Sequence, residues 1–315
     1  MAEIAVQRSS RSILNRSLAF LLRVLHFVVQ VFVNLLKMLA QHLAWVRLRF
    51  LVYQPRADDI FIVTYPRSGT TWMQMIVYQL ASGGDTNFRH IAEVAPWFER
   101  FAETGKDIEA LPSPRLFKTH LRWGGWLRSI PKGPCKYIYV ERNGEDVAVS
   151  YYHHARTTMG FKGSFDQFFR MFMRGRVGYG SWFRHVAEWR RQRHNPNVLY
   201  LTYEELKADL PRAMRAVAEF CGFPIPPGKF PQLVENCSFA YMKRHELKFE
   251  HHTGLVWENG LELEGFLRKG TTGEGQQYLD AAKHSAYHAE YGKWFGGPDF
   301  EHRSTTAREQ PGVSA

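Results

Sequence analysis

The sequence predicts an α/β protein, a three-layer sandwich in which a central parallel sheet is flanked by helices. Two observations lead to this fold class. Short apolar runs rich in β-branched residues alternate along the chain with segments of helical periodicity, a pattern typical of a parallel sheet covered on both faces. The chain has 315 residues, of which 45% are hydrophobic, so it can bury a substantial core.

The strand and helix candidates follow one another from residue 59 onward. The first strand candidate, Asp59–Thr64, reads DIFIVT and precedes a predicted helix at Gly69–Leu80. The other predicted strands are Arg115–His120, Lys136–Arg142 and Asn197–Tyr203. The other predicted helices are Glu145–His154, Ser164–Arg174, Ser181–Arg193 and Leu210–Cys221.

The segment before this region, residues 17–46, reads as one helix without Pro or Gly. Its polar residues form one narrow stripe at steps of three and four: Arg23, His26, Gln30, Asn34, Lys37 and Gln41. The stripe leaves no apolar run near the ~20 residues that span a bilayer, and it fits a cleavable signal peptide poorly. We expect an amphipathic helix in the membrane interface. A helix packed on protein, or a spanning helix whose stripe meets another helix, stays open.

Charge and cysteine usage agree with this division of the chain. Residues 1–50 hold seven basic residues and one acidic residue, a net +6 of the total +11, which favours an anionic membrane surface over nucleic acid as partner. The scattered Cys135, Cys221 and Cys237 argue against a disulfide framework and fit a reducing compartment. We expect three parts: a basic amphipathic segment 1–54, an α/β domain 55–299 and a flexible tail 300–315.

Residues 64–72, TYPRSGTTW, lie between the first predicted strand and helix and form a predicted anion-binding loop. Gly69 allows close backbone approach, and Arg67 adds a fixed charge. Hydroxyl groups come from Ser68, Thr70 and Thr71. No Lys follows Gly69, so the loop is not a Walker A motif. A tight turn with an incidental Arg is the alternative interpretation.

Two further segments could hold a second anion. Tyr137–Tyr152 is a strand followed by Arg142 and a helix that carries Ser150. Near the C-terminus, Arg268 and Lys269 stand beside Gly270. Each segment alone is also typical of a strand end or a solvated turn.

Together these motifs resemble the cytosolic sulfotransferase family. Residues 64–72 match its TYPKSGTTW loop except at Arg67. Further matches are KTH at Lys118–His120, RNxxDVAVSYYH at Arg142–His153, YGSW and HVxEW within Tyr179–Trp189, YE[DE][LM]K at Tyr203–Lys207, and RKGxxG at Arg268–Gly273. The resemblance implies a P-loop-NTPase-like fold for residues 55–299. It also implies transfer of a sulfuryl group from 3′-phosphoadenosine 5′-phosphosulfate (PAPS) to an acceptor hydroxyl or amine, which leaves 3′,5′-adenosine bisphosphate.

The resemblance also implies roles for individual residues. His120 would be the general base in an in-line displacement, and Lys118 and Arg67 would neutralise developing charge. The 5′-phosphate would lie at Ser68, Gly69, Thr70 and Thr71, and the 3′-phosphate at Arg142, Ser150, Arg268, Lys269 and Gly270. Trp72 and Phe239 would enclose adenine, with Tyr203 near its edge and Cys237 where the family has Thr. Plain core packing is the alternative for the three aromatic residues.

The partners are less defined by the sequence. The acceptor is expected to be a small molecule, with an apolar or amphiphilic one among the candidates. It should lie against Pro96, Trp97, Phe98, Tyr151, His154 and the loop 240–265. No metal is expected, because the cations of the protein itself would do the neutralising, and His245, His251 and His252 fit no ligand spacing. The family's dimer motif would fall on Gln276, Asp280, Ala281 and Ser285 and is not matched. We therefore expect a monomer or a different interface.

The sequence favours an enzyme in the cytoplasm, either free or at a membrane surface, and leaves two other functions open. A P-loop nucleotide kinase would need Mg²⁺ and a Lys after the loop Gly. A membrane-associated nucleotide-binding protein without turnover would not need Lys118 and His120, both of which this chain has.

Overall fold

The structure is a computed structural model that describes residues 2–125, 129–249, 267–268 and 270–296, with side chains from residue 18 onward. The expected tail 300–315 and Lys269 lie outside these residues, and so do residues 250–265 of the expected loop 240–265. The chain forms two compact units, Met1–Tyr53 with Glu99–Ile108, and Gln54–Phe98 with Glu109–Ala315.

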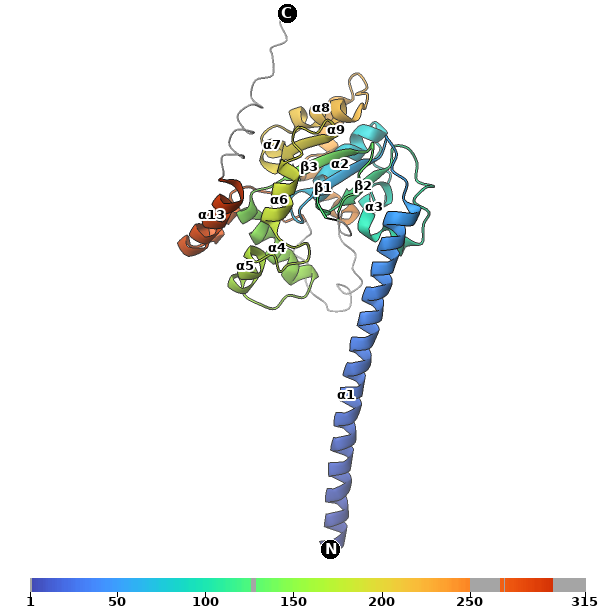
Figure 1. Cartoon of the computed structure of the whole chain (residues 1–315), viewed down its shortest axis with the longest axis vertical. Coiled ribbons are helices and arrows are strands. Elements are labelled where there is room, and N and C mark those ends of the chain that lie inside the picture. The colour runs from blue at the N-terminus through green and yellow to red at the C-terminus, as the bar shows by residue number, and fades with distance from the viewer. Residues whose placement is uncertain (1, 126–128, 250–266, 269, 297–315) are drawn as a thin grey trace, which may run out of the picture. The chain divides into compact units, whose positions relative to one another are not determined.

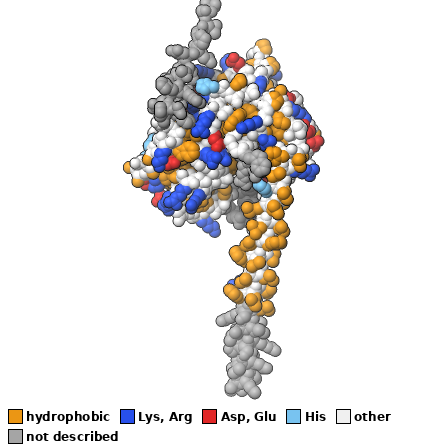
Figure 2. Space-filling model, viewed as in Figure 1, with side chains coloured by type: hydrophobic (Ala, Val, Ile, Leu, Met, Phe, Trp, Pro, Cys, Tyr) orange, Lys and Arg blue, Asp and Glu red, His pale blue; other side chains and the backbone are white. Residues whose placement is uncertain are grey.

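The first unit is dominated by helix α1, Ala2–Arg47, which continues into a π-helical turn at Leu48–Val52. Hydrophobic side chains cover the described part of α1 (Figure 2), and Phe20, Phe27 and Met38 are each at least 65% exposed. By length and composition alone, Leu18–Val52 could cross a membrane, a test that signal sequences and buried core helices also pass. The helix is longer than the sequence predicted, and the spanning alternative remains open.

The second unit is built on a parallel sheet with the strand order β2-β1-β3-β4. The strands are β1 Ile60–Thr64, β2 Leu116–Thr119, β3 Lys136–Glu141 and β4 Val198–Thr202. All four predicted strands are present, and their ends differ from the expected ones by one residue at most. In the register, Val63 pairs with Thr119 and Thr64 with Val140, so the carboxyl ends of β1, β2 and β3 meet at one edge.

Helices cover both faces of this sheet (Figure 1), which confirms the predicted three-layer fold. Side chains alternate along β1, as the period of a strand requires. Ile60 and Ile62 pack into one core with α2 Thr70–Ser82, α8 Leu210–Cys221 and α9 Phe230–Asn236. Phe61 lies on the other face, where its ring stacks on Phe117 and Tyr137.

A second, largely aromatic core joins the remaining long helices. It contains residues of α4 Gly144–Thr158, α5 Phe165–Met173, α6 Trp182–Arg190 and α13 Ala281–Phe295. The five helices predicted after residue 54 are all present. The sequence did not predict α3 Ile91–Val94, α7 Tyr203–Ala208, α9, α10 Phe239–Arg244, α12 Glu274–Tyr278, α13 or the 3-10 turns Phe98–Thr104 and Glu246–Lys248.

A buried ion pair ties the starts of β1 and β2 together. The guanidinium of Arg115 donates from Nε to Oδ1 of Asp59 at 2.6 Å and from Nη2 to Oδ2 at 2.7 Å. Its Nη1 also donates to Glu109 at 2.8 Å. Both side chains of the Asp59–Arg115 pair are fully buried, so the two charges depend on each other for compensation.

Candidate active site

The turn between β1 and α2 holds the backbone in a conformation that only some residues tolerate. Gly69 has φ 94° and Arg67 has φ 70°, both in the left-handed region. A Cβ added to Gly69 would lie only 2.8 Å from Cδ2 of Tyr203. The hydroxyl of Ser68 is buried without a hydrogen-bond partner among the described residues. Such orphan polar groups call for a ligand or water.

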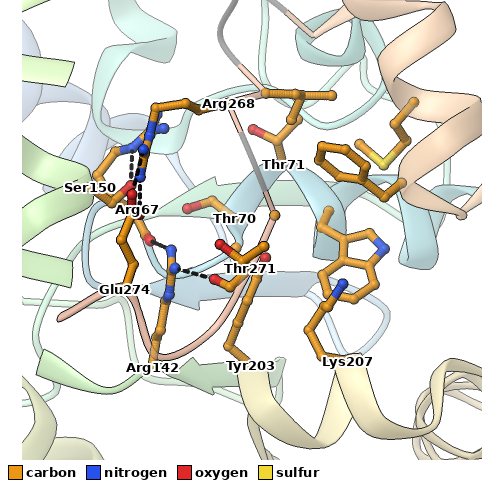
Figure 3. Close-up of a pocket in the computed structure, with 16 residues that line it drawn as sticks. Arg67, Thr70, Thr71, Arg142, Ser150, Tyr203, Lys207, Arg268, Thr271 and Glu274 are labelled. Atoms are coloured by element: carbon orange, nitrogen blue, oxygen red, sulfur yellow. Dashed lines mark hydrogen bonds and ion pairs between the residues drawn. The ribbon is translucent and has the colours of Figure 1, made fainter. Parts of the chain in front are cut away.

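This turn forms one wall of an open pocket of about 860 Å³, part of it open to solvent (Figure 3). Eleven residues proposed from the sequence line it: Arg67, Gly69, Thr70, Thr71, Trp72, Arg142, Ser150, Tyr203, Phe239, Arg268 and Gly270. The sequence did not assign Lys207, Met242, Leu267, Thr271 and Glu274 to the site, although they line it too.

Arg142 connects three walls of the pocket. Its Nη1 donates to the carbonyl oxygen of Arg67 and its Nη2 to that of Thr271, each at 3.0 Å (Figure 3). The guanidinium also lies over the ring of Tyr203, 4.5 Å from its centroid. Its Nε is buried and has no partner among the described residues. Arg142 thus shapes the pocket and keeps one donor for a ligand.

Two more arginines face the same space. Arg67 donates from Nε to Oγ of Ser150 at 3.3 Å. Arg268 forms a two-pronged ion pair with Glu274, in which Nη1 lies 2.6 Å from Oε1. Burial lowers the pKa of Arg67 to about 10, and the charges of Arg142 and Arg268 contribute. The pocket therefore concentrates positive charge that a polyanion would relieve.

The opposite side of the pocket is aromatic. Trp72 donates from Nε1 to the carbonyl oxygen of Cys237 at 2.8 Å, and its ring meets Tyr203 edge-on at 5.5 Å. Phe239 packs so closely on Gly270 that a Cβ there would lie 2.6 Å from its ring. The Cys237 side chain is fully buried, and burial raises the pKa of its thiol. Cys237 does not itself line the pocket, although its carbonyl oxygen contacts the lining residue Trp72.

His120 follows β2, one strand away from the loop. Its Nδ1 donates to the carbonyl oxygen of Thr64 at 2.9 Å, which leaves the lone pair on Nε2. Thr64 connects the two sites, because its Oγ1 also lies 2.6 Å from Oγ1 of the pocket residue Thr70. His120 and Lys118 are themselves absent from the lining of the described pocket.

Aromatic side chains surround His120. Its ring meets Trp97 at 5.5 Å and Tyr179 at 4.9 Å between centroids, both edge-on. Nζ of Lys118 lies 4.5 Å from the centroid of Trp97. The sequence showed Tyr179 only as part of the YGSW motif. No local pattern predicted that its ring would contact His120.

Two other residues expected around the acceptor, His154 and Phe98, lie in different surroundings. Burial, with the charges of Arg67 and Lys118, lowers the pKa of His154 to about 3, so its imidazole is neutral at physiological pH. Phe98, by contrast, is fully buried and packs edge-on against Phe61 at 5.1 Å. It belongs to the core beneath the sheet, and its expected place in the acceptor pocket was wrong.

A parallel α/β sheet whose first strand ends in a cationic anion-binding loop, next to an oriented imidazole, defines the class of nucleotide-dependent group-transfer enzymes. Comparison with known proteins identifies the family. The sulfotransferase domain family matches residues 57–298. Sulfotransferase 1A1 of Bos taurus is 36% identical over 250 residues, which cover 76% of this chain and 84% of that protein. Sulfotransferase 2B1 of Mus musculus is 35% identical over 243 residues, which cover 75% and 71%.

Solved structures agree with this fold. Mouse sulfotransferase SULT7A1 complexed with PAP has a TM-score of 0.65 and 25% identity, covering 84% of this chain and 93% of that one. Retinol dehydratase, solved with androsterone and PAP, has a TM-score of 0.70 and 24% identity, covering 81% and 86%. A second structure of it contains retinol and PAP.

The chain belongs to the sulfotransferase domain family. It is a PAPS-dependent sulfotransferase, as the sequence predicted. Family membership decides against the nucleotide kinase and against a binding protein without turnover.

Proposed function

We propose that residues 55–299 form the catalytic domain, that the pocket binds PAPS, and that His120 takes the proton of a small apolar or amphiphilic alcohol or phenol. One observation carries the proposal. Arginines from three separate segments, Arg67, Arg142 and Arg268, converge on one pocket that Thr64 connects to His120.

The described residues fit a nucleotide with two anionic ends. Gly69, Thr70 and Thr71 line the pocket, and the neighbouring Oγ of Ser68 is buried without a partner among the described residues, so this turn suits the 5′-phosphate. The unpartnered Nε of Arg142, with Ser150, Arg268 and Gly270, suits the 3′-phosphate. Trp72 and Phe239 offer faces for the adenine, with Tyr203 at its edge. Bound PAPS supplies the sulfuryl group that is transferred.

The chemistry of the chain's own residues follows from their environment. Nε2 of His120 accepts the acceptor proton, because Nδ1 is committed to the Thr64 carbonyl. Arg67 and Lys118 neutralise the charge that develops during in-line transfer. Even with its pKa lowered to about 10, Arg67 stays charged at neutral pH and acts as a fixed cation without moving a proton.

The substitution His120→Ala tests the assignment. Transfer of radiolabelled sulfate from PAPS should fall by roughly 10²-fold or more, the usual scale of general base catalysis. Calorimetric binding of 3′,5′-adenosine bisphosphate should stay within about twofold, because His120 does not line the described pocket. The exposed His194→Ala serves as control. A near-normal rate in His120→Ala would remove the imidazole from the mechanism.

The surroundings of His120 and the exposed α1 suggest the type of acceptor and its place. Trp97 and Tyr179 form an apolar, flat-sided environment for an acceptor ring. The apolar surface of Leu18–Val52, flanked by the basic residues of the N-terminal segment, suits the surface of an anionic membrane from the cytoplasmic side.

Vesicle flotation of the full chain, with and without anionic lipid, measures this contact. We expect anionic vesicles to carry the protein and alkaline carbonate to release it. Resistance to carbonate would indicate a spanning helix, and no flotation would exclude the membrane.

A further inference from the structure

Three potential metal ligands meet where α13 approaches the start of α4. His284 and His288 are four residues apart on α13 and therefore share one face of that helix. Glu145, at the start of α4, is 3% exposed. Nδ1 of His284 lies 2.8 Å from Oε1 of Glu145, and Nε2 of His288 lies 3.7 Å from the same oxygen. One donor atom from each residue lies within 4.8 Å of the others.

The ring of His284 has an acceptor on each side. Its Nδ1 faces the carboxylate of Glu145, and its Nε2 lies 3.3 Å from the carbonyl oxygen of Gln276. A neutral imidazole carries only one N–H, so one nitrogen would direct its lone pair at an acceptor. A second proton on the ring, or a metal ion bound by His284 and Glu145, would satisfy both contacts.

We propose that Glu145, His284 and His288 bind a divalent transition-metal ion of the zinc class. Ligand atoms of a tetrahedral zinc site, with bonds of about 2.0–2.2 Å, lie about 3.3–3.6 Å apart. The separations of 2.8 and 3.7 Å bracket this value. His288 can adjust, because its side chain is 67% exposed. Solvent completes the coordination.

Two features of the surrounding structure suit a metal ligand. A metal-bound imidazole usually donates from its other nitrogen to a backbone carbonyl, and Gln276 offers one to His284. His288 is too distant from Glu145 for a hydrogen bond but is suitably placed to share an ion with it. None of the three ligands lines the nucleotide pocket, so the ion would not itself contact the nucleotide.

A metal here would join α13 to the loop that carries Glu274. The residue after Glu145, Asp146, accepts the amide hydrogens of Gly273 at 2.9 Å and Gly275 at 2.7 Å. These amides flank Glu274, the partner of Arg268. The ion would therefore stabilise the C-terminal part of the fold, and heat should unfold the zinc-loaded protein at a higher temperature.

The substitution His288→Ala tests the proposal, since it removes a ligand and leaves the Glu145–His284 contact. Full-length protein freed of metal is titrated with Zn²⁺ against a chromophoric chelator, and His194→Ala is the matched control. We expect wild type and His194→Ala each to bind one equivalent of Zn²⁺. The affinity of His288→Ala for this equivalent should be at least tenfold lower. Zinc should raise the melting temperature of the first two proteins only.

Cobalt gives an independent readout of the geometry. Co²⁺ in a tetrahedral site of two imidazoles and a carboxylate absorbs visible light, and this band should be lost in His288→Ala. Equal zinc affinity in wild type and His288→Ala, or no binding by wild type at micromolar zinc, would overturn the proposal and leave an imidazolium–carboxylate pair.

Discussion

Replacement of Gly69 by Ala would alter the nucleotide loop by a single methyl group. The new Cβ would lie 2.8 Å from Cδ2 and 3.2 Å from Cε2 of Tyr203. Carbon atoms pack best at about 3.5–4.0 Å, so the ring or the loop must move by roughly 0.7–1.2 Å. Tyr203 cannot move alone, because the guanidinium of Arg142 lies over it and Trp72 meets its edge.

The expected effects on activity and stability differ in origin. A displacement of about 1 Å at a positioning loop can cost roughly 10²-fold in rate, so we expect kcat/KM for sulfuryl transfer to fall by about that factor. Affinity for 3′,5′-adenosine bisphosphate should also fall, by roughly tenfold or more. The left-handed φ of 94° adds a backbone cost of about 1–2 kcal/mol to folding.

Gly222→Ala is a matched control for this substitution. Gly222 follows α8 with φ 77°, and an added Cβ would have nothing within 4 Å. It should lose only the backbone part of the free energy of unfolding in urea, about 1–2 kcal/mol, and bind the bisphosphate like wild type in calorimetry. If Gly69→Ala also bound like wild type, the contact with Tyr203 would not shape the nucleotide site.

Three further predictions concern stability and are measured by urea or thermal unfolding. Asp59→Ala should lower the free energy of unfolding by about 3–5 kcal/mol, since it removes the buried partner of Arg115. Glu109→Ala, at a half-exposed site, should lower it less, and equal losses would contradict this reasoning. Burial lowers the pKa of His185 to about 3. Below pH 6.5 this imidazole is therefore protonated in the unfolded chain and stays neutral in the folded chain, which favours unfolding. Wild type should therefore lose about 2 kcal/mol more than His185→Gln between pH 7.5 and 5.0, and parallel pH curves would refute this. Adenosine bisphosphate at 100 times its Kd should add about 2.7 kcal/mol, and no gain in melting temperature would contradict its binding to the folded chain.

The sheet could be predicted from sequence because its strands are buried on both faces. The five residues of β1 are all buried, which appears in the sequence as a continuous apolar run. Helices such as α8 could be found from their amphipathic periodicity and from the Gly222 that ends them. Helix α13 was missed because only Tyr287 and Phe295 of its fifteen residues are buried, so no apolar stripe marks it.

The pocket was predictable only in part. The loop at residues 64–72 is a local feature, and its motif is readable in one segment. Glu274 and Lys207 line the same pocket through tertiary packing, which no local pattern encodes. The placement of Phe98 was wrong because an aromatic residue near the site can equally pack beneath the sheet, as its contacts with Phe61 and Phe117 show.

The short side-by-side pairing of β1 and β2 has a consequence for engineering this protein. Val63 and Thr119 are register partners, so backbone hydrogen bonds fix the separation between the loop after β1 and the imidazole after β2. That spacing does not depend on the identity of the side chains around it. Libraries that randomise Trp97 and Tyr179 can therefore search for new acceptors while the spacing between nucleotide loop and base stays constant.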